Sequence, residues 1–480
     1  MLHDAGLRPG DVVALLTDND LRTFEVYWAA LRSGLYITVV NHHLSPDEVA
    51  YIVNDSGARA IVASAAQAEL AQALTPLTPD VGLRLAFGGD IATFSSYADA
   101  LAAASPVPFP HQPHGMTMLY SAGTTGRPKG VRPALPDGEI TTVSDAMTAL
   151  LGSYFGMDAS TVYLSPAPLY HAAPLRWCTA VQSFGGTVLV TKKFDSETCL
   201  RTIEQFAVTH AQFVPTMFVR MLQLPQDVRS RYDSSSLKVA VHAAAPCPVE
   251  VKQQMIDWWG PILVEYYAGT ESNGMTITDS ATWLTKPGTV GKAAIGILHI
   301  CDDEGRELAA GEVGTVYVER DTAVFSYHND PQKTRAAQHH EHPLWTTLGD
   351  VGYLDDDGYL FLTDRKAFMI ISGGVNIYPQ ETENALALHP AVFDVAVIGL
   401  PDAEMGETVA AFVQPRPGVQ PSDLLGEELI AFVKSKIASF KAPKIVRFVD
   451  TLPRTETGKL VKRVLKDQHA TTVAASASPK

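Results

Sequence analysis

The sequence predicts an α/β fold with a large N-terminal domain of layered β-sheets and flanking helices, a small β-rich subdomain, and a smaller α+β C-terminal domain. Three observations lead to this prediction. Strand patterns alternate with helix patterns early in the chain, short strands bounded by Gly and Asp follow residue 287, and a block with its own alternation follows residue 364. Alternating strands and helices favour a parallel sheet covered by helices. A chain of 480 residues is long enough for more than one domain.

The first half of the chain supplies the alternation. Residues 11–17 form an apolar run typical of a buried strand, residues 23–33 have the spacing of an amphipathic helix, and residues 36–40 predict the next strand. The other apolar strand candidates of this region are residues 58–63, 187–190, 211–214, 239–242 and 262–267.

The second half contains shorter predicted strands. In the β-rich subdomain these are residues 297–301 and 314–319, and the turn-rich residues 354–359 predict a hairpin. The C-terminal block is predicted to contain strands at residues 369–371, 392–398 and 408–414 and helices at residues 379–388 and 425–435. Residues 471–480, rich in Ala and Ser, are expected to form a loose tail.

Composition and charge exclude several classes of protein. The net charge of -15 argues against a nucleic-acid-binding protein, which needs a basic face. No apolar run approaches the roughly 18 residues of a membrane span, and residues 1–4 lack the features of a signal peptide. The four cysteines, Cys178, Cys199, Cys247 and Cys301, have no spacing suited to zinc and are predicted to be free thiols. We therefore expect a cytoplasmic enzyme.

The sharpest local feature is the loop at residues 121–129, which follows an apolar run at residues 116–119. Its small residues let backbone N–H groups approach an anion, its hydroxyls can donate to phosphate oxygens, and its lysine adds a point charge. The candidate phosphate-binding residues are Ser121, Gly123, Thr124, Thr125, Gly126 and Lys129. The loop lacks the spacing of a Walker A motif. Composition alone leaves a phosphate-binding loop and a plain flexible loop open.

Four further segments follow this loop along the chain: residues 267–271 (YAGTE), 348–350 (LGD), 364–366 with 371–381 (DRK and ISGGVNIYPQE), and 453–459 (PRTETGK). In this order the five segments resemble the motifs of the AMP-binding, or adenylate-forming, enzyme superfamily. That superfamily includes acyl- and aryl-CoA ligases, firefly luciferase and the adenylation domains of peptide synthetases. The resemblance extends over nearly the whole chain.

The resemblance implies roles for the residues around the nucleotide. Glu271 matches the Mg²⁺-binding position, where a hard cation prefers oxygen ligands, and Thr270 is expected to bond a phosphate oxygen. Tyr267 is expected to pack on adenine, Asp350 to accept the ribose hydroxyls, and Arg365 to reach the ribose. Outside the motifs, Tyr267 would be interpreted as a core aromatic, Asp350 as a turn residue and Arg365 as a member of a surface ion pair.

Lys459 is the strongest catalytic candidate. The attack of a carboxylate on the α-phosphate brings two anions together, and a cation that contacts both offsets their repulsion. Without the motif, we would interpret Lys459 as part of a solvated basic turn together with Lys462 and Arg463. The resemblance favours the catalytic interpretation.

The acyl site is predicted from segments that resemble the family's substrate-binding regions. His171, within residues 164–174, is expected to border the carboxylate and gate the site. Residues 214–216 and 242–246 are expected to line the acyl channel and the adenine pocket, with Ala244, Ala245 and Pro246 at the nucleotide. Because these segments lack a Lys or Arg for a second carboxylate, we predict an apolar acid of the fatty, aryl or terpenoid and steroid type.

The resemblance also implies two half-reactions in two domain orientations. Residues 1–363 form the expected AMP-binding domain, residues 364–367 the hinge, and residues 368–470 the mobile C-terminal domain. One orientation uses Lys459, and the other brings Gly373 and Gly374 to the site, where their small size leaves room for pantetheine.

Three features depart from the family pattern: Ala367 at the hinge, Ala268 in place of the usual Gly, and a start that lacks several tens of residues, through either a misassigned start or a missing element.

The sequence therefore predicts an AMP-forming acyl-CoA ligase that uses ATP, Mg²⁺ and coenzyme A on a small-molecule carboxylic acid. Two alternatives remain: an adenylating enzyme that loads a carrier protein, and a non-catalytic nucleotide-binding protein. The sequence leaves a homo-oligomer open.

Overall fold

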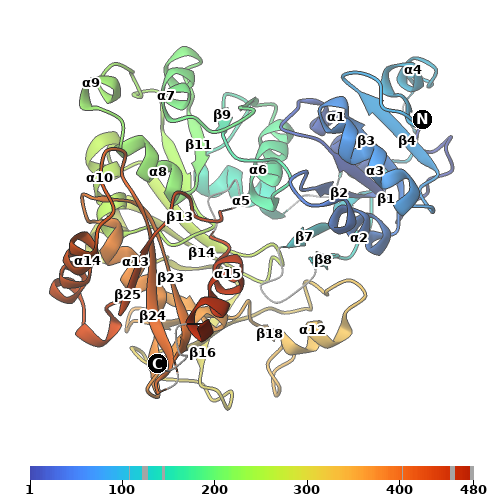
Figure 1. Cartoon of the computed structure of the whole chain (residues 1–480). Helices are drawn as coiled ribbons and strands as arrows, with labels where there is room; N and C mark the ends of the chain where they lie inside the picture. The colour runs from blue at the N-terminus through green and yellow to red at the C-terminus, as the bar shows by residue number, and fades with distance from the viewer. Residues whose placement is uncertain (108, 122–127, 143–145, 403, 455–459, 476–480) are drawn as a thin grey trace.

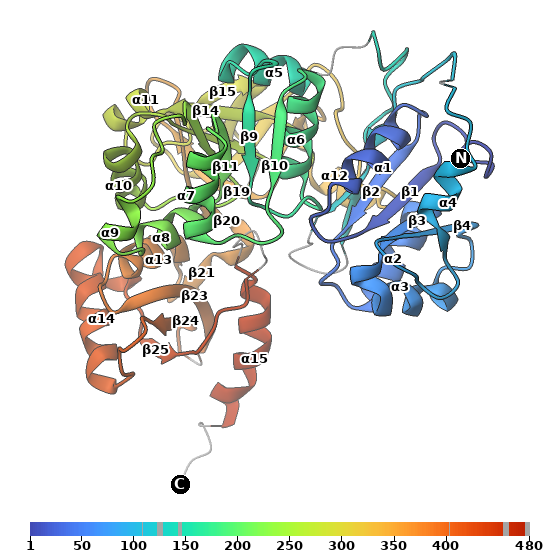
Figure 2. The same cartoon turned by 90° about the horizontal axis from the view of Figure 1, so that it is seen from above.

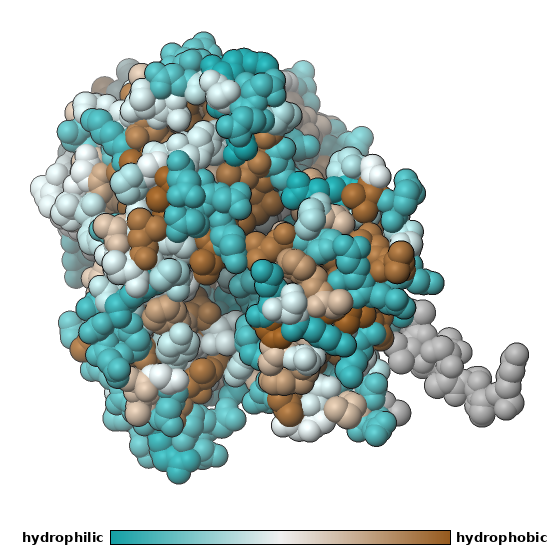
Figure 3. All heavy atoms as spheres, turned by 90° about the vertical axis from the view of Figure 1, so that its left-hand side faces the viewer, coloured by the Kyte–Doolittle hydropathy of each residue, from teal (hydrophilic) through white to brown (hydrophobic). Residues whose placement is uncertain are grey.

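The structure is a computed structural model that describes residues 1–107, 109–121, 128–142, 146–402, 404–454 and 460–475. Figures 1 and 2 show an N-terminal sheet with helices on both of its faces, a second sheet at the centre, and a C-terminal unit packed beneath the second sheet. This arrangement is the mixed α/β fold with layered sheets and a smaller C-terminal unit that the sequence predicts. On the face in Figure 3, hydrophilic and hydrophobic residues are interspersed, as on an ordinary protein surface.

The N-terminal sheet is parallel and has the strand order β5-β4-β3-β1-β2-β6. Its elements are β1 (Val12–Leu16), α1 (Arg22–Leu31), β2 (Tyr36–Val40), α2 (Pro46–Ser56), β3 (Ala58–Ser64), α3 (Ala68–Leu74), β4 (Leu83–Phe87), β5 (Ser95–Ser96), α4 (Tyr97–Ala102) and β6 (Met116–Thr117). Strands β1 and β2 are buried at every position, because hydrophobic clusters cover both faces of the sheet.

The central sheet has the strand order β10-β9-β11-β12-β13-β14-β15, with β14 and β15 antiparallel at one edge. Its elements are α5 (Ala146–Phe155), β9 (Val162–Ser165), α6 (Ala172–Ser183), β10 (Thr187–Val190), α7 (Ser196–Gln205), β11 (His210–Phe213), α8 (Pro215–Leu222), α9 (Gln226–Arg229), β12 (Val239–His242), α10 (Val249–Trp259), β13 (Leu263–Ala268), β14 (Met275–Asp279), α11 (Ser280–Thr285) and β15 (Lys292–Ile295). The carboxyl ends of β12 and β13 lead into segments of the candidate site.

The β-rich subdomain is an antiparallel sheet of order β16-β17-β19-β20, with β18 paired to β17. Its elements are β16 (Ile297–Cys301), β17 (Gly314–Glu319), α12 (Pro331–Ala336), β18 (Trp345–Thr346), β19 (Asp350–Leu354) and β20 (Leu360–Arg365). A separate hairpin joins β7 (Leu119–Ser121) to β8 (Lys129–Val131). Short 3₁₀ helices lie at Ala65–Gln67, Thr75–Leu77, Lys366–Phe368 and Ser439–Lys441.

The C-terminal unit has its own sheet, of order β22-β21-β24-β23 with β25 paired to β24. Its elements are β21 (Ile370–Ser372), β22 (Val375–Ile377), α13 (Pro379–Ala387), β23 (Val392–Asp402), β24 (Gly406–Pro415), α14 (Asp423–Lys436), β25 (Ile445–Phe448) and α15 (Lys462–Ala475). Its two hydrophobic clusters draw all their members from residues 370–465, so this unit has a core of its own.

Most predicted elements form within one or two residues of their expected bounds. The hairpin β23–β24 is longer than the two predicted strands. Its backbone pairing continues beyond the apolar run, through the pairs from Leu400 to Asp402. Helix α15 continues to Ala475, into the segment expected to be a loose tail, which agrees with the high helix propensity of its alanines. The four cysteines are free thiols, as predicted. Within the described part of the chain, no helix combines the length and apolar character needed to cross a bilayer.

Candidate active site

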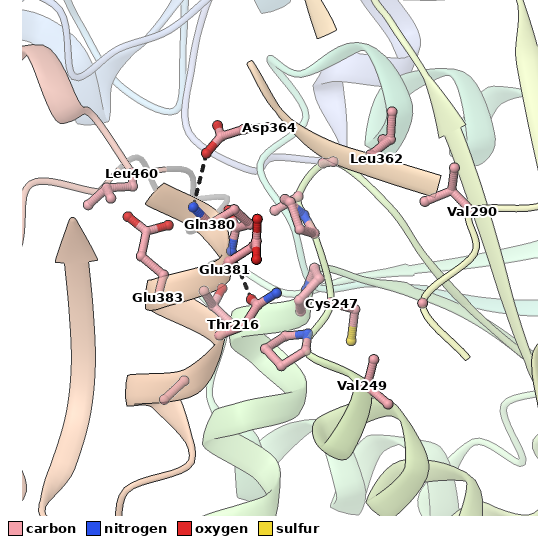
Figure 4. A pocket seen from close by; sticks show the side chains of 18 of the residues that line it. Thr216, Cys247, Val249, Val290, Leu362, Asp364, Gln380, Glu381, Glu383 and Leu460 are labelled. Carbon is pink, nitrogen blue, oxygen red and sulfur yellow. Dashed lines mark hydrogen bonds between the residues drawn. The ribbon is translucent and has the colours of Figure 1, made fainter. Parts of the chain in front are cut away.

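A cavity of about 690 Å³ lies between the central sheet, the end of β20 and the C-terminal unit. Figure 4 shows Thr216 and Cys247 on one side of this cavity and Gln380, Glu381 and Glu383 of helix α13 on the other. We call the side formed by residues 215–365 the nucleotide wall and the side formed by residues 380–462 the C-terminal wall. Sites at the junction of two units are a common place for ligands.

Three predicted nucleotide-binding residues form one chain of contacts on the nucleotide wall. The Tyr267 hydroxyl donates to Asp350 Oδ2 at 2.6 Å, and Arg365 Nε lies 2.9 Å from Asp350 Oδ1. Asp350 and Arg365 are direct partners in the antiparallel pairing of β19 with β20, so the sheet register fixes their approach. Each carboxylate oxygen has a second lone-pair site, so Asp350 can still accept bonds from a ligand.

The electrostatics of this chain keep its members in fixed charge states. Burial, and then the neighbouring Asp350 carboxylate, raise the pKa of Tyr267 well above its usual range, so the phenol remains a donor. Burial by itself would lower the pKa of Arg365, but the neighbouring Asp350, Tyr267 and Glu271 together outweigh it and the net shift is upward. The nucleotide wall therefore presents a protonated phenol, a carboxylate and a guanidinium.

The backbone of the nucleotide wall is strained at Ala244 and Ser272. Ala244, which follows β12 and lines the cavity, has φ of 75°, and Ser272, directly after Glu271, has φ of 55°. A side chain in this left-handed region costs about 1–2 kcal/mol. Such strain persists only where the surrounding structure holds it, and it concentrates at ligand sites.

Glu271 lies at the end of the turn that follows β13. Its side chain is buried, and its Oε1 accepts a 2.9 Å hydrogen bond from the Tyr327 hydroxyl. A Cβ added at Gly269 would meet a Leu348 side-chain carbon at 2.4 Å and Glu271 Oε2 at 3.0 Å, so a side chain here would displace Leu348 and crowd Glu271. Thr270 lies between them and is half-buried.

The hairpin β7–β8 carries the two ends of the predicted phosphate loop. Ser121 and Lys129 are paired across the hairpin, and Lys129 Nζ lies 4.7 Å from the centre of the Tyr327 ring. The candidates Gly123, Thr124, Thr125 and Gly126 lie outside the described residues. The described ends of the loop thus lie near Glu271, with Tyr327 in contact with both sides.

The structure brings only part of the predicted acyl site to this cavity. Thr216 lines it, as do Ala244, Ala245 and Pro246. His171 occupies the N-cap position of α6 with its ring 4.5 Å from that of Tyr170, and it is not among the cavity-lining residues.

Lys459 lies outside the described residues, but both flanks of its motif line the C-terminal wall. Arg454 makes a two-fold contact with Asp394 of β23, at 2.6 and 2.7 Å, and Lys462 Nζ lies 2.8 Å from Glu383 Oε1 of α13. Gly373 and Gly374 are instead exposed at the tip of the β21–β22 hairpin. The described flanks of the lysine motif, and not the glycine pair, therefore line the cavity.

A buried charged cluster behind the nucleotide wall did not follow from the motifs. Lys252 of α10 donates to Glu265 Oε2 of β13 at 2.7 Å, and His242 Nε2 lies 3.7 Å from the same oxygen. Burial lowers the pKa of His242 well below its usual value, and neither of its ring nitrogens has a hydrogen-bond partner among the described residues. The available signal was Lys252 itself, which stands on the apolar face of α10 with Met255, Ile256 and Trp259.

Asp364 links the two walls. Its Oδ2 accepts a hydrogen bond of 2.9 Å from the backbone N–H of Gln380, at the start of α13 (Figure 4). A carboxylate at a helix N-terminus satisfies a free donor and complements the helix dipole. Burial raises the pKa of Asp364 all the same, which marks this carboxylate as largely removed from water.

Comparison with known families gives two matches that together span most of the chain. The profile of the AMP-binding enzyme family matches residues 1–328, and the profile of the AMP-binding enzyme C-terminal domain matches residues 381–459.

Individual relatives are similar over almost their full length. The chain is 34% identical to a feruloyl-CoA synthase of Amycolatopsis sp, with 96% of this chain and 89% of the relative aligned. It is 30% identical to the fatty acid–[acyl-carrier-protein] ligase ScoC of Streptomyces coeruleorubidus, with 97% and 88% aligned. The crystal structure of the anthranilate CoA ligase AuaEII with anthranoyl-AMP superposes with a TM-score of 0.85 at 26% identity, covering 98% of this chain and 90% of that one.

Proposed function

The chain belongs to the AMP-binding enzyme family, and on this premise we propose that it is an ATP-dependent acyl-CoA ligase that activates an apolar carboxylic acid as an acyl-adenylate. One observation carries the proposal. The contact chain Tyr267–Asp350–Arg365 faces, across one cavity, the two flanks of the Lys459 motif.

In the first half-reaction, a carboxylate oxygen attacks the α-phosphorus of ATP and the bond to pyrophosphate breaks. Tyr267 offers a ring to adenine, and Asp350 accepts the ribose hydroxyls, so the nucleotide is held in line for attack. Lys459 offsets the negative charge that two approaching anions bring together. Thr270, Ser121, Gly123, Thr124, Thr125, Gly126 and Lys129 contact the phosphates.

In the second half-reaction, the sulfur of coenzyme A attacks the acyl carbon and AMP leaves. We propose that residues 1–363 and 368–470 change their relative orientation about residues 364–367, so that Gly373 and Gly374 replace the lysine motif at the site. Support comes from the independent core of the C-terminal unit and from the exposure of both glycines in the present arrangement. Ala367 is part of this proposed hinge.

Magnesium is part of the proposal because ATP binds as its magnesium complex. The described residues contain no cluster of three or more acidic, His or Cys side chains that fits a metal on its own. The single carboxylate of Glu271 fits, since Mg²⁺ is usually held by one or two carboxylates together with substrate phosphates. The ion neutralises phosphate charge when bound.

The acid is proposed to be apolar, of the fatty, aryl or terpenoid and steroid type. The nucleotide wall continues past Ala244 into a region lined by Pro215, Val219 and Trp283. Support also comes from the relatives, whose names refer to ferulic acid and to a fatty acid. His171 remains a candidate gate for this substrate.

The four free thiols support a cytoplasmic location of the enzyme, because thiols stay reduced there.

A carrier protein is the second candidate acceptor, because one similar protein is a fatty acid–[acyl-carrier-protein] ligase. The two acceptors share the first half-reaction and differ in the thiol of the second. Free coenzyme A and a phosphopantetheinyl carrier protein therefore separate them.

The proposal is tested with a panel of fatty, aryl and steroid acids and polar amino acids, each incubated with ATP, Mg²⁺ and coenzyme A. We expect acid-dependent release of pyrophosphate, and mass spectrometry should detect the matching CoA thioester. Parallel reactions replace coenzyme A with a holo-carrier protein. Pyrophosphate release by polar amino acids alone would overturn the apolar substrate class, and no release with any acid would favour a non-catalytic nucleotide-binding protein.

A further inference from the structure

Tyr327 contacts two candidate phosphate-binding residues from different parts of the chain. Its hydroxyl donates to Glu271 Oε1 at 2.9 Å, and Lys129 Nζ lies 4.7 Å from the centre of its ring. The Tyr327 side chain is buried, with 7% of its surface exposed. No motif discussed above includes Tyr327.

The backbone around Tyr327 is tied to the phosphate-loop hairpin. Tyr327 forms a bridge with Val131, the last residue of β8, and the His328 N–H donates to Gly130 O at 2.8 Å. The Tyr327 N–H donates to Thr334 Oγ1 at 3.0 Å, which fixes the residue from the side of α12. The position of Tyr327 is therefore set by the hairpin itself, so movement of the hairpin is passed to the ring.

The two contacts use different parts of the Tyr327 side chain. The ring attracts the Lys129 ammonium through a cation–π contact, which holds the charge without a hydrogen bond. The hydroxyl occupies Glu271 Oε1 and so orients the carboxylate, leaving Oε2 for another partner. One side chain thus sets the positions of a cation and an anion that a metal-bound triphosphate needs at once.

We propose that Tyr327 is a positioning residue for Mg·ATP: its hydroxyl aims Glu271 at the metal, and its ring holds Lys129 for the phosphates. The proposal rests on the proposed function only in taking Mg·ATP as the ligand. A purely structural Tyr327 would pack with Phe325 and Val131 and would leave metal dependence untouched.

The test compares two substitutions that remove one contact each. Tyr327→Phe keeps the ring over Lys129 and removes only the donor to Glu271, whereas Tyr327→Leu removes both contacts. ATP binding is measured by isothermal titration calorimetry on the full chain, with Mg²⁺ and with EDTA, and with no acid present so that no turnover occurs. Tyr317→Phe, in β17 of the same subdomain, is the matched control.

For Tyr327→Phe we expect the affinity for Mg·ATP to fall about tenfold to a hundredfold, the range for a hydrogen bond to a charged group. Its affinity for metal-free ATP should stay within about twofold of the wild type. Tyr327→Leu should weaken binding in both conditions, and Tyr317→Phe in neither. Adding Tyr327→Phe to Glu271→Gln should have no further effect on Mg·ATP affinity.

Equal losses with and without Mg²⁺ in Tyr327→Phe, or no loss at all, would overturn the proposal. Should Tyr327→Phe not fold, Thr334→Val is used, which loosens the backbone of Tyr327 and so both contacts, and it must weaken ATP binding more with Mg²⁺ than with EDTA. A wild-type chain that binds Mg·ATP but releases no pyrophosphate with any acid would contradict the proposed function. It would leave the proposal for Tyr327 open to test, because the titration measures ATP binding without turnover. A wild-type chain that does not bind Mg·ATP would overturn both.

Discussion

The two walls of the cavity are held in place by different means. On the nucleotide wall, Asp350 and Arg365 are cross-strand partners in one sheet, and Tyr267 reaches them from the end of another sheet. On the C-terminal wall, Arg454 and Lys462 are held by ion pairs to Asp394 and Glu383 on either side of residues 455–459. The sheet register holds Asp350 and Arg365 within the body that forms the nucleotide wall, whereas both ion pairs lie inside the C-terminal unit and would move with it about the proposed hinge. We therefore expect the nucleotide wall to act in both half-reactions and the C-terminal wall in the first alone.

The largest expected effect comes from Lys459→Ala. Loss of a preorganised charge contact of this kind costs about 3–4 kcal/mol, or roughly a hundredfold to a thousandfold in rate. The loss should appear in acid-dependent pyrophosphate formation and not in thioester formation from supplied acyl-AMP. Stopped-flow assays of each half-reaction measure this, with Lys466→Ala of α15 as control. Wild-type pyrophosphate formation by Lys459→Ala would contradict the assignment of the C-terminal wall to the first half-reaction.

Asp350→Ala should affect both half-reactions. It removes the acceptor of Tyr267 and leaves the Arg365 guanidinium without its carboxylate, which costs about 2–3 kcal/mol of binding, or roughly thirtyfold to a hundredfold. Calorimetric titration with ATP and with AMP should show similar losses. The exposed Asp356→Asn, in the turn after β19, is the control. A loss confined to pyrophosphate formation would contradict the assignment of this wall to both steps.

Asp394→Asn tests the C-terminal wall without touching the proposed catalytic lysine. It replaces the two-fold contact with Arg454 by at most a single neutral one, so pyrophosphate formation should slow about tenfold. Thioester formation from acyl-AMP should change less than about twofold. Asp467→Asn removes the exposed ion pair with Arg463 on α15 and serves as the control. Equal slowing of both steps would mean that this ion pair acts on the unit as a whole.

The buried His242 makes the nucleotide wall sensitive to acid. Because its pKa is lowered in the folded chain, the unfolded chain takes up a proton below pH 6.5 that the folded chain does not. Stability should therefore fall as the pH drops below that value, by up to about 1.4 kcal/mol per pH unit from this group. In His242→Leu this share of the slope should vanish, as measured by denaturant unfolding between pH 7.5 and 5. The exposed His111→Gln should keep the wild-type slope, and an unchanged slope in His242→Leu would contradict the assignment.

Ala244→Gly should have the smallest effect. Glycine relieves the left-handed strain of about 1 kcal/mol and loses a similar amount through the greater freedom of the unfolded chain. The melting temperature should stay the same or rise slightly, and ATP affinity should change less than about threefold. The neighbouring Ala243→Gly, which has no such strain, should lower the melting temperature. A clear loss of stability in Ala244→Gly would show that the left-handed conformation is not imposed by the fold.

The sequence predicted the nucleotide wall better than its counterpart, for a physical reason. Tyr267, Asp350 and Arg365 stand in short motifs at strand ends, and strand patterns place such ends at one edge of a sheet. Asp394 and Glu383 stand inside a strand and a helix, where nothing in the local pattern singles them out from ordinary polar residues. Their partners are about 60 and 79 residues away, a separation that local periodicity does not encode.

Tyr327 and the cluster of His242, Lys252 and Glu265 could not be predicted for a related reason. Each contact joins elements from different strands or subdomains, so it depends on the packing of the whole chain and not on a motif. Only Lys252 could be noticed in the sequence, because it is a charged residue on the apolar face of a helix. The fold class and most strand bounds followed from hydrophobic patterning, because a buried strand such as β1 consists of apolar residues alone.

Asp364 and Arg365 are adjacent in the chain but serve different units: one caps helix α13 and the other pairs with Asp350. A single peptide bond therefore separates the residue that pairs with Asp350 from the residue that binds the first turn of α13. Both side chains line the cavity, so we expect a ligand that bonds Arg365 to affect the neighbouring contact with α13 before any other. For the change of orientation proposed above, this adjacency is the shortest covalent path between the ligand and the C-terminal unit.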